Sequence, residues 1–191
     1  MQERSKIRVQ RILQAAALLM RSKSLDSLTI REIAQQAEVS PATVYQFFPH
    51  REAIFQHVLV SNFEKLDHRL EQDLQSADID SIEDAVRVFV KAHETHYASD
   101  QNIINLFYNT PLPASLAQEN LEHHRRLAGI LASTLLQHHL VKPGTPDIAF
   151  KIAIEVGSRI FEMSARQGEI DREVIQEGEL LICTYLRIYH S

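Results

Sequence analysis

The sequence predicts an all-α protein with an N-terminal three-helix helix-turn-helix domain followed by a C-terminal helical domain. Apolar residues recur at helical spacing along most of the chain, and two helix-start signals lie close together, at Thr29 and Ser40. Glycine and proline are few, with five and six in 191 residues, and the alternating runs typical of strands are missing. We expect about nine helices and two domains, residues 1–50 and residues 51–191.

The first helix is expected over residues 5–22, and the helix-turn-helix pair follows it. Thr29 and Glu32 form a T-x-x-E capping box, in which each side chain satisfies a free backbone N–H group. Ser40 and Pro41 supply the second start, with serine as N-cap and proline in the first turn. The buried stripe expected on the first helix is Ile7, Ile12, Leu13, Ala16, Leu19 and Met20.

A long helix is expected over residues 51–75, and its length indicates that it continues from the small domain into the second one. Beyond it the pattern stays helical and is interrupted by polar or proline-containing breaks. The helices expected there cover residues 81–97, 101–109, 114–139, 145–167 and 171–189.

The last two helices have more apolar surface than a single buried stripe requires, which predicts a partner. Gly157 and Gly178 lie inside them despite a helix-propensity cost of about 1 kcal/mol each. Close approach across a helical interface would explain both glycines. We expect a homodimer through the last two helices, with two helices from each subunit in a four-helix bundle. The alternative is a central helix pair enclosed in one large monomer.

Charge is distributed unevenly along the chain, whose formal net charge is −5. Residues 1–50 hold seven basic and four acidic side chains, and residues 51–191 hold 13 and 21. A basic end joined to an acidic remainder is typical of a protein with a nucleic-acid partner. Without a long apolar run or a signal peptide, we expect a cytoplasmic protein with no membrane partner. The single cysteine, Cys183, is expected to pack in the core.

Over about residues 1–55 the chain resembles the TetR (TetR/AcrR-like) family of bacterial transcriptional regulators. The matching residues are a basic first helix and the stretches Leu28–Ala34, Ala37–Ser40, Thr43–Phe48 and Arg51-Glu52. The rest of the chain matches the family in being helical, in its length and in its two very apolar last helices. The resemblance implies a dimer that binds double-stranded DNA and holds a small-molecule pocket in its C-terminal domain.

The resemblance also implies which residues touch DNA, although each of them taken singly could be plain helix surface. Gln46 is expected to bond adenine at two atoms, and Thr43 to meet a base edge or a thymine methyl group. Tyr45, Thr29 and Arg51 are expected to contact phosphates. The complete expected set is Thr29, Ser40, Pro41, Ala42, Thr43, Tyr45, Gln46, Phe47, His50 and Arg51.

Two positions depart from the family pattern. Phe47 lacks the hydroxyl of the tyrosine often found there, so any contact that it makes is apolar. Pro49 and His50 replace a commoner basic or polar pair and leave one phosphate contact dependent on His50. We therefore expect DNA binding to strengthen modestly as His50 takes up a proton. The N-terminal stretch is expected to be either a minor-groove arm or a disordered tail, with the basic residues Arg4, Lys6 and Arg8.

The implied pocket has candidate lining residues on the middle helices. They are Phe89, His93, Tyr97, Phe107, Tyr108 and Arg159. An arginine among apolar neighbours must pair with an acid, face solvent or meet an anionic ligand. Arg159 thus has two main interpretations, an ion pair with Glu155 or Glu162, or a contact to the effector. The sequence does not identify the effector, and no cofactor is expected.

Ten histidines raise the question of a metal site. His93 and His96 are spaced for two ligands on one helical face, whereas adjacent pairs such as His123 and His124 point about 100° apart. A zinc site needs three or four convergent ligands, so no metal site is expected. The chain holds no nucleophile–base pair, glycine-rich phosphate loop or H-E-x-x-H motif, so no enzyme is expected.

The expected function is a dimeric transcriptional repressor that leaves a pseudo-palindromic operator when a small molecule binds. Two recognition helices would enter successive major grooves about 34 Å apart, and the effector would change that spacing. One alternative is a DNA-binding dimer without a small-molecule effector, whose C-terminal domain docks a protein partner. A less favoured alternative is a helical metalloenzyme that uses His93 and His96.

Overall fold

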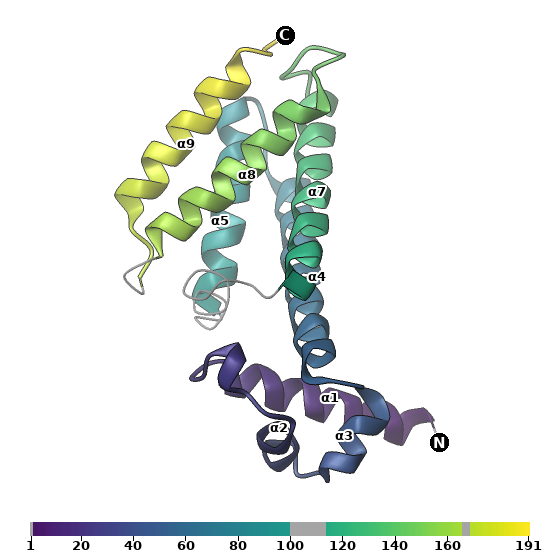
Figure 1. Cartoon of the computed structure of the whole chain (residues 1–191). Helices are drawn as coiled ribbons and strands as arrows, with labels where there is room; N and C mark the ends of the chain where they lie inside the picture. The colour runs from purple at the N-terminus through teal and green to yellow at the C-terminus, as the bar shows by residue number, and fades with distance from the viewer. Residues whose placement is uncertain (1, 100–113, 166–168) are drawn as a thin grey trace. The chain divides into compact units, whose positions relative to one another are not determined.

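Every regular element of the computed structural model is helical in the parts of the chain that it describes, residues 2–99, 114–165 and 169–191. Eight α-helices and one short 3-10 helix lie in these ranges (Figure 1). They are α1 (Gln2–Leu19), η1 (Leu25–Ser27), α2 (Ile30–Gln36), α3 (Pro41–Phe47), α4 (Arg51–Ser76), α5 (Ile82–Ser99), α7 (Ala114–Gln137), α8 (Asp147–Ser164) and α9 (Arg172–Arg187). The all-α prediction is therefore confirmed, while the helix expected at residues 101–109 lies outside the described residues.

The chain divides into two compact units, and the division falls inside α4, between Asn62 and Phe63. The first unit holds α1 to α3, the first part of α4 and the start of α7. The second holds the rest of α4 and α7 together with α5, α8 and α9. The sequence-based boundary at residue 50 coincides instead with the start of α4 at Arg51.

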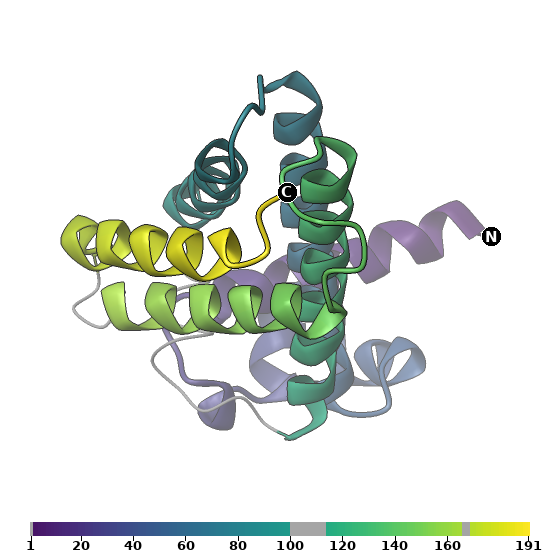
Figure 2. The same cartoon turned by 90° about the horizontal axis from the view of Figure 1, so that it is seen from above.

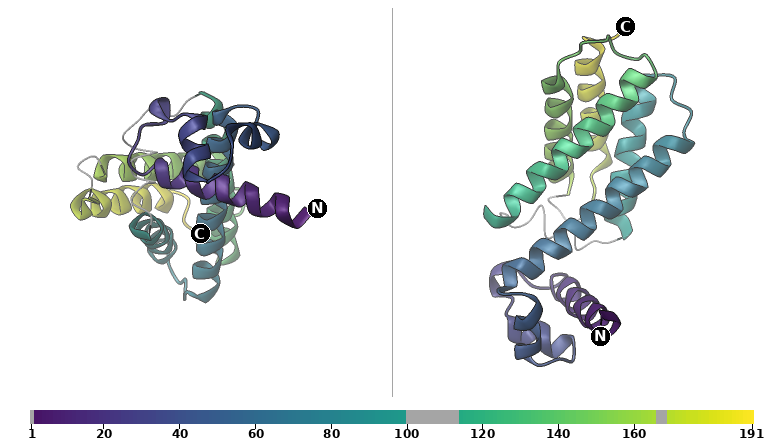
Figure 3. Two further views of the ribbon diagram at one scale, coloured as in Figure 1. Left: turned by 90° about the horizontal axis from the view of Figure 1, so that it is seen from below. Right: turned by 90° about the vertical axis from the view of Figure 1, so that its right-hand side faces the viewer.

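In the first unit α1, α2, α3 and the beginning of α4 lie together (Figure 3, left), and their buried apolar side chains form its core. The helical spacing predicts most of its members, which are Ile12, Ala16, Met20, Leu28, Ile33, Ala34, Val44, Phe48, Ile54 and Phe55. Ile7 is an exception at 50% exposure. It lies in the first turns of α1, where Lys6 and Arg8 are exposed too. The stripe therefore becomes core only from Ile12 onward.

In the second unit α8 and α9 lie side by side and run in opposite directions, and α5 packs against α9 (Figures 1 and 2). A Cβ atom at Gly178 of α9 would stand 2.5 Å from Cγ2 of Ile160 on α8, so only glycine permits this approach. The close contact expected at Gly178 thus lies between two helices of one chain. A Cβ at Gly157 would stand 3.4 Å from Ile182, at the edge of ordinary van der Waals contact.

The core of the second unit draws on all five of its helices. Buried members include Leu66, Leu70, Ile82, Val86, Phe89, Leu131, Leu135, Phe150, Ile182 and Leu186. The α4 and α7 segments of this unit are joined by polar contacts as well, since Nε of Arg126 lies 2.9 Å from Oδ2 of Asp67. Both helices are visible along their length in Figure 3 (right).

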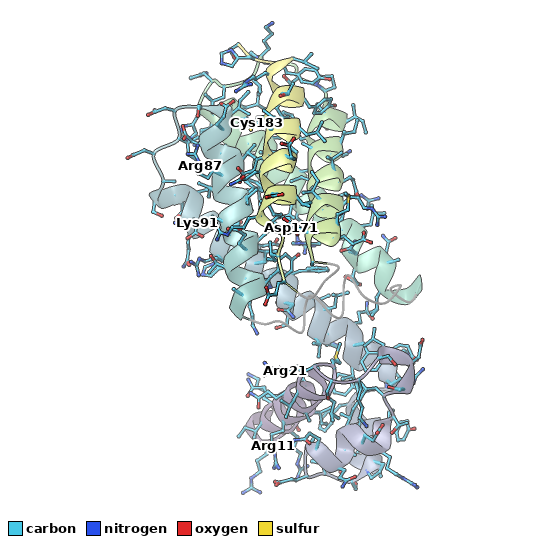
Figure 4. The ribbon with its side chains drawn as sticks, turned by 90° about the vertical axis from the view of Figure 1, so that its left-hand side faces the viewer. Arg11, Arg21, Arg87, Lys91, Asp171 and Cys183 are labelled. Atoms are coloured by element: carbon cyan, nitrogen blue, oxygen red, sulfur yellow. The ribbon has the colours of Figure 1, made fainter. Side chains whose placement is uncertain are left out.

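The last two helices begin in different ways. Asp171, labelled in Figure 4, is the N-cap of α9 and accepts a hydrogen bond from the Glu173 backbone N–H at 2.9 Å, as predicted. At the start of α8 the cap is Pro146, which makes no side-chain bond. The hydroxyl of Thr145 instead donates to the carbonyl oxygen of Lys142 at 2.7 Å.

Among the helices that the structure describes, none combines the length and the apolar character needed to cross a bilayer.

Candidate nucleic-acid interface and effector site

The start of α2 has the capping box that the sequence predicts. The Thr29 hydroxyl oxygen accepts from the Glu32 backbone N–H at 3.3 Å, and the Thr29 backbone N–H donates to Oε2 of Glu32 at 2.9 Å. The Thr29 hydroxyl also donates to that oxygen, and Lys23 pairs with the same carboxylate. Bonds from Lys23 and then Thr29 lower the pKa of Glu32 to about 2. This helix start is therefore held in place within the unit.

The second helix of the pair, α3, begins as predicted. The Ser40 side chain accepts from the Thr43 backbone N–H at 3.1 Å, and Pro41 occupies the first turn. Oγ of Ser40 and Oγ1 of Thr43 lie 2.9 Å apart, so the two hydroxyls share a hydrogen bond. The side chains at the cap and in the first turn of α3 are small, so another molecule can approach the backbone of this turn closely.

One face of α3 is open to solvent and the other is core. Val44 and Phe48 are buried at 0% and 3% exposure. Tyr45 is 57% exposed although it is large and aromatic, and Gln46 is exposed beside it. Phe47 is half-buried. The exposed face thus presents a phenol hydroxyl and a carboxamide, two groups that can bind phosphate and base edges.

The turn between α2 and α3 contains a residue that the sequence reasoning did not single out. Glu38 has φ of +53°, the left-handed conformation that usually favours glycine. The Val39 backbone N–H donates to the carbonyl of Ala34 at 2.9 Å, which closes α2 as a Schellman motif does. Oε2 of Glu38 lies 2.7 Å from Nη2 of Arg11 on α1, an arginine labelled in Figure 4. Arg11 lies far from Glu38 in the sequence, so no local pattern indicated this ion pair.

His50 and Arg51, both expected to bind phosphate, make bonds inside the unit. Nδ1 of His50 accepts from the Ala53 backbone N–H at 3.2 Å and so caps α4. Nη1 of Arg51 donates to the carbonyl oxygens of Asp26 and Leu28 at 2.9 and 2.8 Å. The Arg51 guanidinium therefore ties the start of α4 to the chain just before α2.

Three of the six candidate effector residues come together on one face of α5. Phe89, His93 and Tyr97 are one turn apart, and Phe161 of α8 joins them. The ring centroid of Phe161 lies 5.3 Å from that of His93 and 5.7 Å from that of Tyr97. Phe107 and Tyr108 lie outside the described residues.

The remaining candidate, Arg159, has an exposed side chain on α8 that forms an ion pair with Glu162. Of the two interpretations of Arg159, an ion pair or a contact to the effector, the structure thus shows the ion pair. The described aromatic cluster contains no arginine.

His93 is held in one orientation by the backbone of its own helix. Its Nδ1 lies 2.7 Å from the carbonyl oxygen of Phe89, so this nitrogen carries the proton that the carbonyl accepts. Removal from water lowers the pKa of His93 to about 4, although the hydrogen bond to the Phe89 carbonyl acts in the opposite direction. The neutral ring then has its lone pair on Nε2. No group of three or more His, Cys, Asp or Glu side chains within the described ranges is arranged to hold a metal ion.

A buried histidine on α7 was missed by the sequence reasoning. His123 is 3% exposed, and its ring stacks on Phe63 of α4 with a centroid distance of 3.9 Å. Nδ1 of His123 lies 3.1 Å from Oδ1 of Asp67, whose other oxygen meets Arg126. The signal available was Asp67 itself, an acid inside the apolar stripe of the long helix.

The electrostatics of this group follow from burial and from its partners. Burial lowers the pKa of His123 by more than the Asp67 carboxylate raises it. Burial raises the pKa of Asp67, but the adjacent His123 ring and the hydrogen bond from Arg126 together bring it below the usual value. An ionised carboxylate beside a largely neutral imidazole is the state that we infer. The neighbouring His124 pairs with Glu155 of α8 at 2.9 Å.

The outer faces of α8 and α9 leave large apolar side chains exposed. They are Ile148, Ile152, Met163, Leu180, Leu181 and Ile188, exposed by 40% to 70%. Cys183 of α9, labelled in Figure 4, is buried, and desolvation raises the pKa of its thiol to about 11, which makes it unreactive. The expectation that it packs in the core is confirmed.

Comparison with known proteins finds one family model, which matches part of the first unit. Residues 12–58 match the family model of bacterial regulatory proteins of the tetR family. No curated protein sequence matches the chain.

Solved structures match over nearly the whole chain. A TetR-family transcriptional regulator from Streptomyces coelicolor is 22% identical with a TM-score of 0.73, over 95% of this chain and 99% of that one. The regulator FadR from Bacillus subtilis, in complex with stearoyl-CoA, is 18% identical with a TM-score of 0.69, over 92% and 98%. RolR in complex with resorcinol is 19% identical with a TM-score of 0.63, over 100% and 91%. At these identities the likeness shows the fold.

Proposed function

We propose that this chain, which belongs to the TetR family of bacterial regulatory proteins through its N-terminal domain, is a dimeric repressor that a small molecule releases from DNA. The main supporting observation is α3, a capped helix with a buried face and an exposed face that bears Tyr45 and Gln46. Such a helix suits the major groove, where the carboxamide of Gln46 can bond adenine at two atoms.

Phosphate contacts would come from groups that flank this helix. The hydroxyl of Tyr45 is free to reach a phosphate, and the first-turn N–H groups of α2 beyond Thr29 provide the positive end of a helix. These contacts set the register of α3 on the duplex, and base contacts then select the sequence.

Arg51 is proposed to act by positioning rather than by direct contact. Its bonds to the carbonyls of Asp26 and Leu28 orient the residues just before Thr29. Arg51→Lys keeps the charge but loses the fork that reaches two carbonyls. We expect this variant to bind DNA more weakly and to melt at a lower temperature. Unchanged melting with a flatter salt dependence of DNA binding would indicate a direct phosphate contact instead.

Dimerisation is proposed through the outer faces of α8 and α9. Six large apolar side chains exposed on two adjacent helices form the kind of surface that a subunit interface buries. Sedimentation at micromolar concentration is expected to show a dimer, and Leu180→Glu and Leu181→Glu together are expected to yield monomers. A wild-type chain that sediments as a monomer would overturn this part.

The effector response is proposed from the aromatic cluster on α5 and α8 and from ligands bound by similar folds. FadR from Bacillus subtilis is named in complex with stearoyl-CoA, and RolR with resorcinol. In this chain α4 is one continuous helix that belongs to both units. A ligand that shifts α4 in the second unit would therefore change how the first unit is held, with a coupling of about 1–3 kcal/mol.

Selection of bound sequences from random double-stranded DNA tests the proposal. The wild-type chain is expected to enrich a pseudo-palindrome, and Gln46→Ala to relax base choice by about 1–3 kcal/mol at one position of each half-site. Gln75→Ala, at an exposed glutamine of the second unit, is the matched control and is expected to select the same sequence as the wild type. Failure of the wild type to enrich any sequence would contradict DNA readout by α3.

A further inference from the structure

The basic residues near the N-terminus belong to a regular helix. Arg4, Lys6 and Arg8 lie in the first turns of α1, so they form neither an extended arm nor a disordered tail. Arg4, Arg8 and Arg11 are separated by four and three residues, the spacing that places side chains on one face of a helix. All three are exposed. We call the surface that they form the arginine face.

Arg11 lies where the arginine face reaches the turn between α2 and α3. Four residues farther along the same face Ala15 is buried at 5% exposure, so the helix is covered from there on. Nη2 of Arg11 lies 2.7 Å from Oε2 of Glu38 in the turn (Figure 4 labels Arg11). Ser40, the N-cap of α3, follows Glu38 by two residues. The arginine face thus ends beside the start of the helix proposed to read DNA.

Glu38 lies close enough to the proposed DNA surface to affect binding without touching DNA. Its Cα atom is at most about 8 Å from that of Ser40, because consecutive Cα atoms are about 3.8 Å apart. At physiological salt, charges are screened over a distance of about 8 Å. A phosphate next to Ser40 therefore interacts with the charges of the Arg11–Glu38 ion pair.

The Arg11–Glu38 ion pair is suited to an exchange of partners. The two side chains are 44% and 82% exposed, and an ion pair this exposed contributes little to the free energy of unfolding. A guanidinium binds a phosphate through the same fork of N–H groups that binds a carboxylate. A phosphate can therefore replace Glu38 as the partner of Arg11 at little cost to the fold.

The other two arginines of this face differ from Arg11 in their surroundings. Within the described ranges neither Arg4 nor Arg8 has an acidic partner, whereas Arg11 has Glu38. The arginine face therefore carries positive charge in the free chain, and Glu38 offsets that charge only at the end nearest to α3.

We propose that the arginine face is a binding site for the phosphate backbone of DNA and that Glu38 is an internal competitor, which holds Arg11 until a phosphate displaces its carboxylate. This inference rests on the proposed DNA binding by α3 and adds a contact surface outside that helix. Glu38 thereby sets how tightly the chain holds DNA of any sequence.

Binding to double-stranded DNA of random sequence, measured from about 50 to 200 mM salt, tests the contact of Arg11. Arg11→Gln is expected to weaken binding and to reduce the slope of log Kd against log salt by about 0.9 per bound chain, the value for one lost phosphate contact. Arg87→Gln removes an exposed arginine that pairs with Asp84 in the second unit. This matched control is expected to change neither quantity. An unchanged slope for Arg11→Gln would overturn the inference.

The competition is tested by removing the charge of Glu38. Glu38→Gln is expected to bind random-sequence DNA about 2- to 5-fold more tightly, which is the size of one exposed ion pair. The same substitution in the Arg11→Gln chain is expected to gain less, because it releases no arginine. Equal gains in the two backgrounds would mean that Glu38 only repels phosphate, and its role as a competitor would be wrong.

The same variants separate this inference from the proposed function. If Arg11→Gln and Glu38→Gln leave DNA binding unchanged while Gln46→Ala still relaxes base choice, the contact on α1 is wrong and DNA reading by α3 stands. A wild-type chain that does not bind double-stranded DNA at about 50 mM salt would overturn both.

Discussion

Polar side chains cap helices in both units of the chain, as Asp171 does for α9, but among the described residues buried polar side chains lie only in the second unit. In the first unit polar groups lie at helix ends, where Thr29, Ser40 and His50 cap α2, α3 and α4. In the second unit His123 and Asp67 lie inside the helical bundle, where water does not reach them freely. A cap bonds to residues three positions away, whereas a buried pair needs a partner from a distant part of the chain. The first kind is visible in a sequence and the second is not.

The largest effect is expected from breaking the buried pair. Asp67→Ala leaves Arg126 and the buried His123 without their carboxylate, and we expect the free energy of unfolding to fall by about 2–4 kcal/mol. Asp73→Ala removes an acid from the same helix that pairs with Arg69 near the surface, and it is expected to cost about 0.3–0.5 kcal/mol. Urea unfolding measures both. Equal losses would mean that burial does not distinguish the two sites.

Acid is expected to destabilise the second unit before the first. The unfolded chain protonates His93 near pH 6.5, but the folded unit keeps it neutral until about pH 4 because of desolvation. Stability is therefore lost as pH falls between these values, by about 3 kcal/mol. In the first unit the pKa of Glu32 is lowered to about 2, so its carboxylate keeps its contribution to stability down to a lower pH.

Urea unfolding at a series of pH values checks this order. His93→Gln has no such titration, so its stability is expected to vary less across the same range. A wild-type chain with the same pH dependence as His93→Gln would contradict the assignment of the acid sensitivity to His93.

Two glycines within helices, Gly178 and Gly129, allow the effect of close packing on stability to be separated from that of helix propensity. Gly178→Ala would place Cβ 2.5 Å from Cγ2 of Ile160, and we expect a loss of about 1–3 kcal/mol in unfolding free energy. Gly129→Ala on α7 meets nothing within 4 Å and is expected to gain about 0.5–1 kcal/mol. Thermal unfolding of the two variants gives the comparison. A gain in both would show that α8 and α9 are less closely packed than their backbones indicate.

The smallest effect is expected at the turn of the first unit. Glu38→Gly relieves a left-handed backbone and loses an exposed ion pair with Arg11, for a net gain of about 0.5 kcal/mol. Glu38→Ala loses the ion pair and keeps the strain, so it is expected to be about 1 kcal/mol less stable than the glycine variant. Identical melting temperatures for the two would show that the backbone at this turn is unstrained.

Local patterns in the sequence predicted much of the first unit. The two helix starts, the buried Val44 and Phe48 and the exposed Gln46 follow from caps and helical spacing. These signals succeed because their hydrogen bonds and apolar contacts link residues within one or two turns. The same reasoning failed at Ile7, whose apolar character did not show that no other element buries it.

Tertiary structure decided the rest. Only the folded chain shows that Arg51 bonds to the backbone before α2, that Gly178 admits Ile160, and that His123 meets Asp67. Each of these contacts joins residues far apart in sequence, so no local period records it. The sequence by itself determined that the chain is helical and where α3 begins, because caps and stripes are local. The fold alone decided which polar groups are buried and neutral, because burial depends on all the helices together.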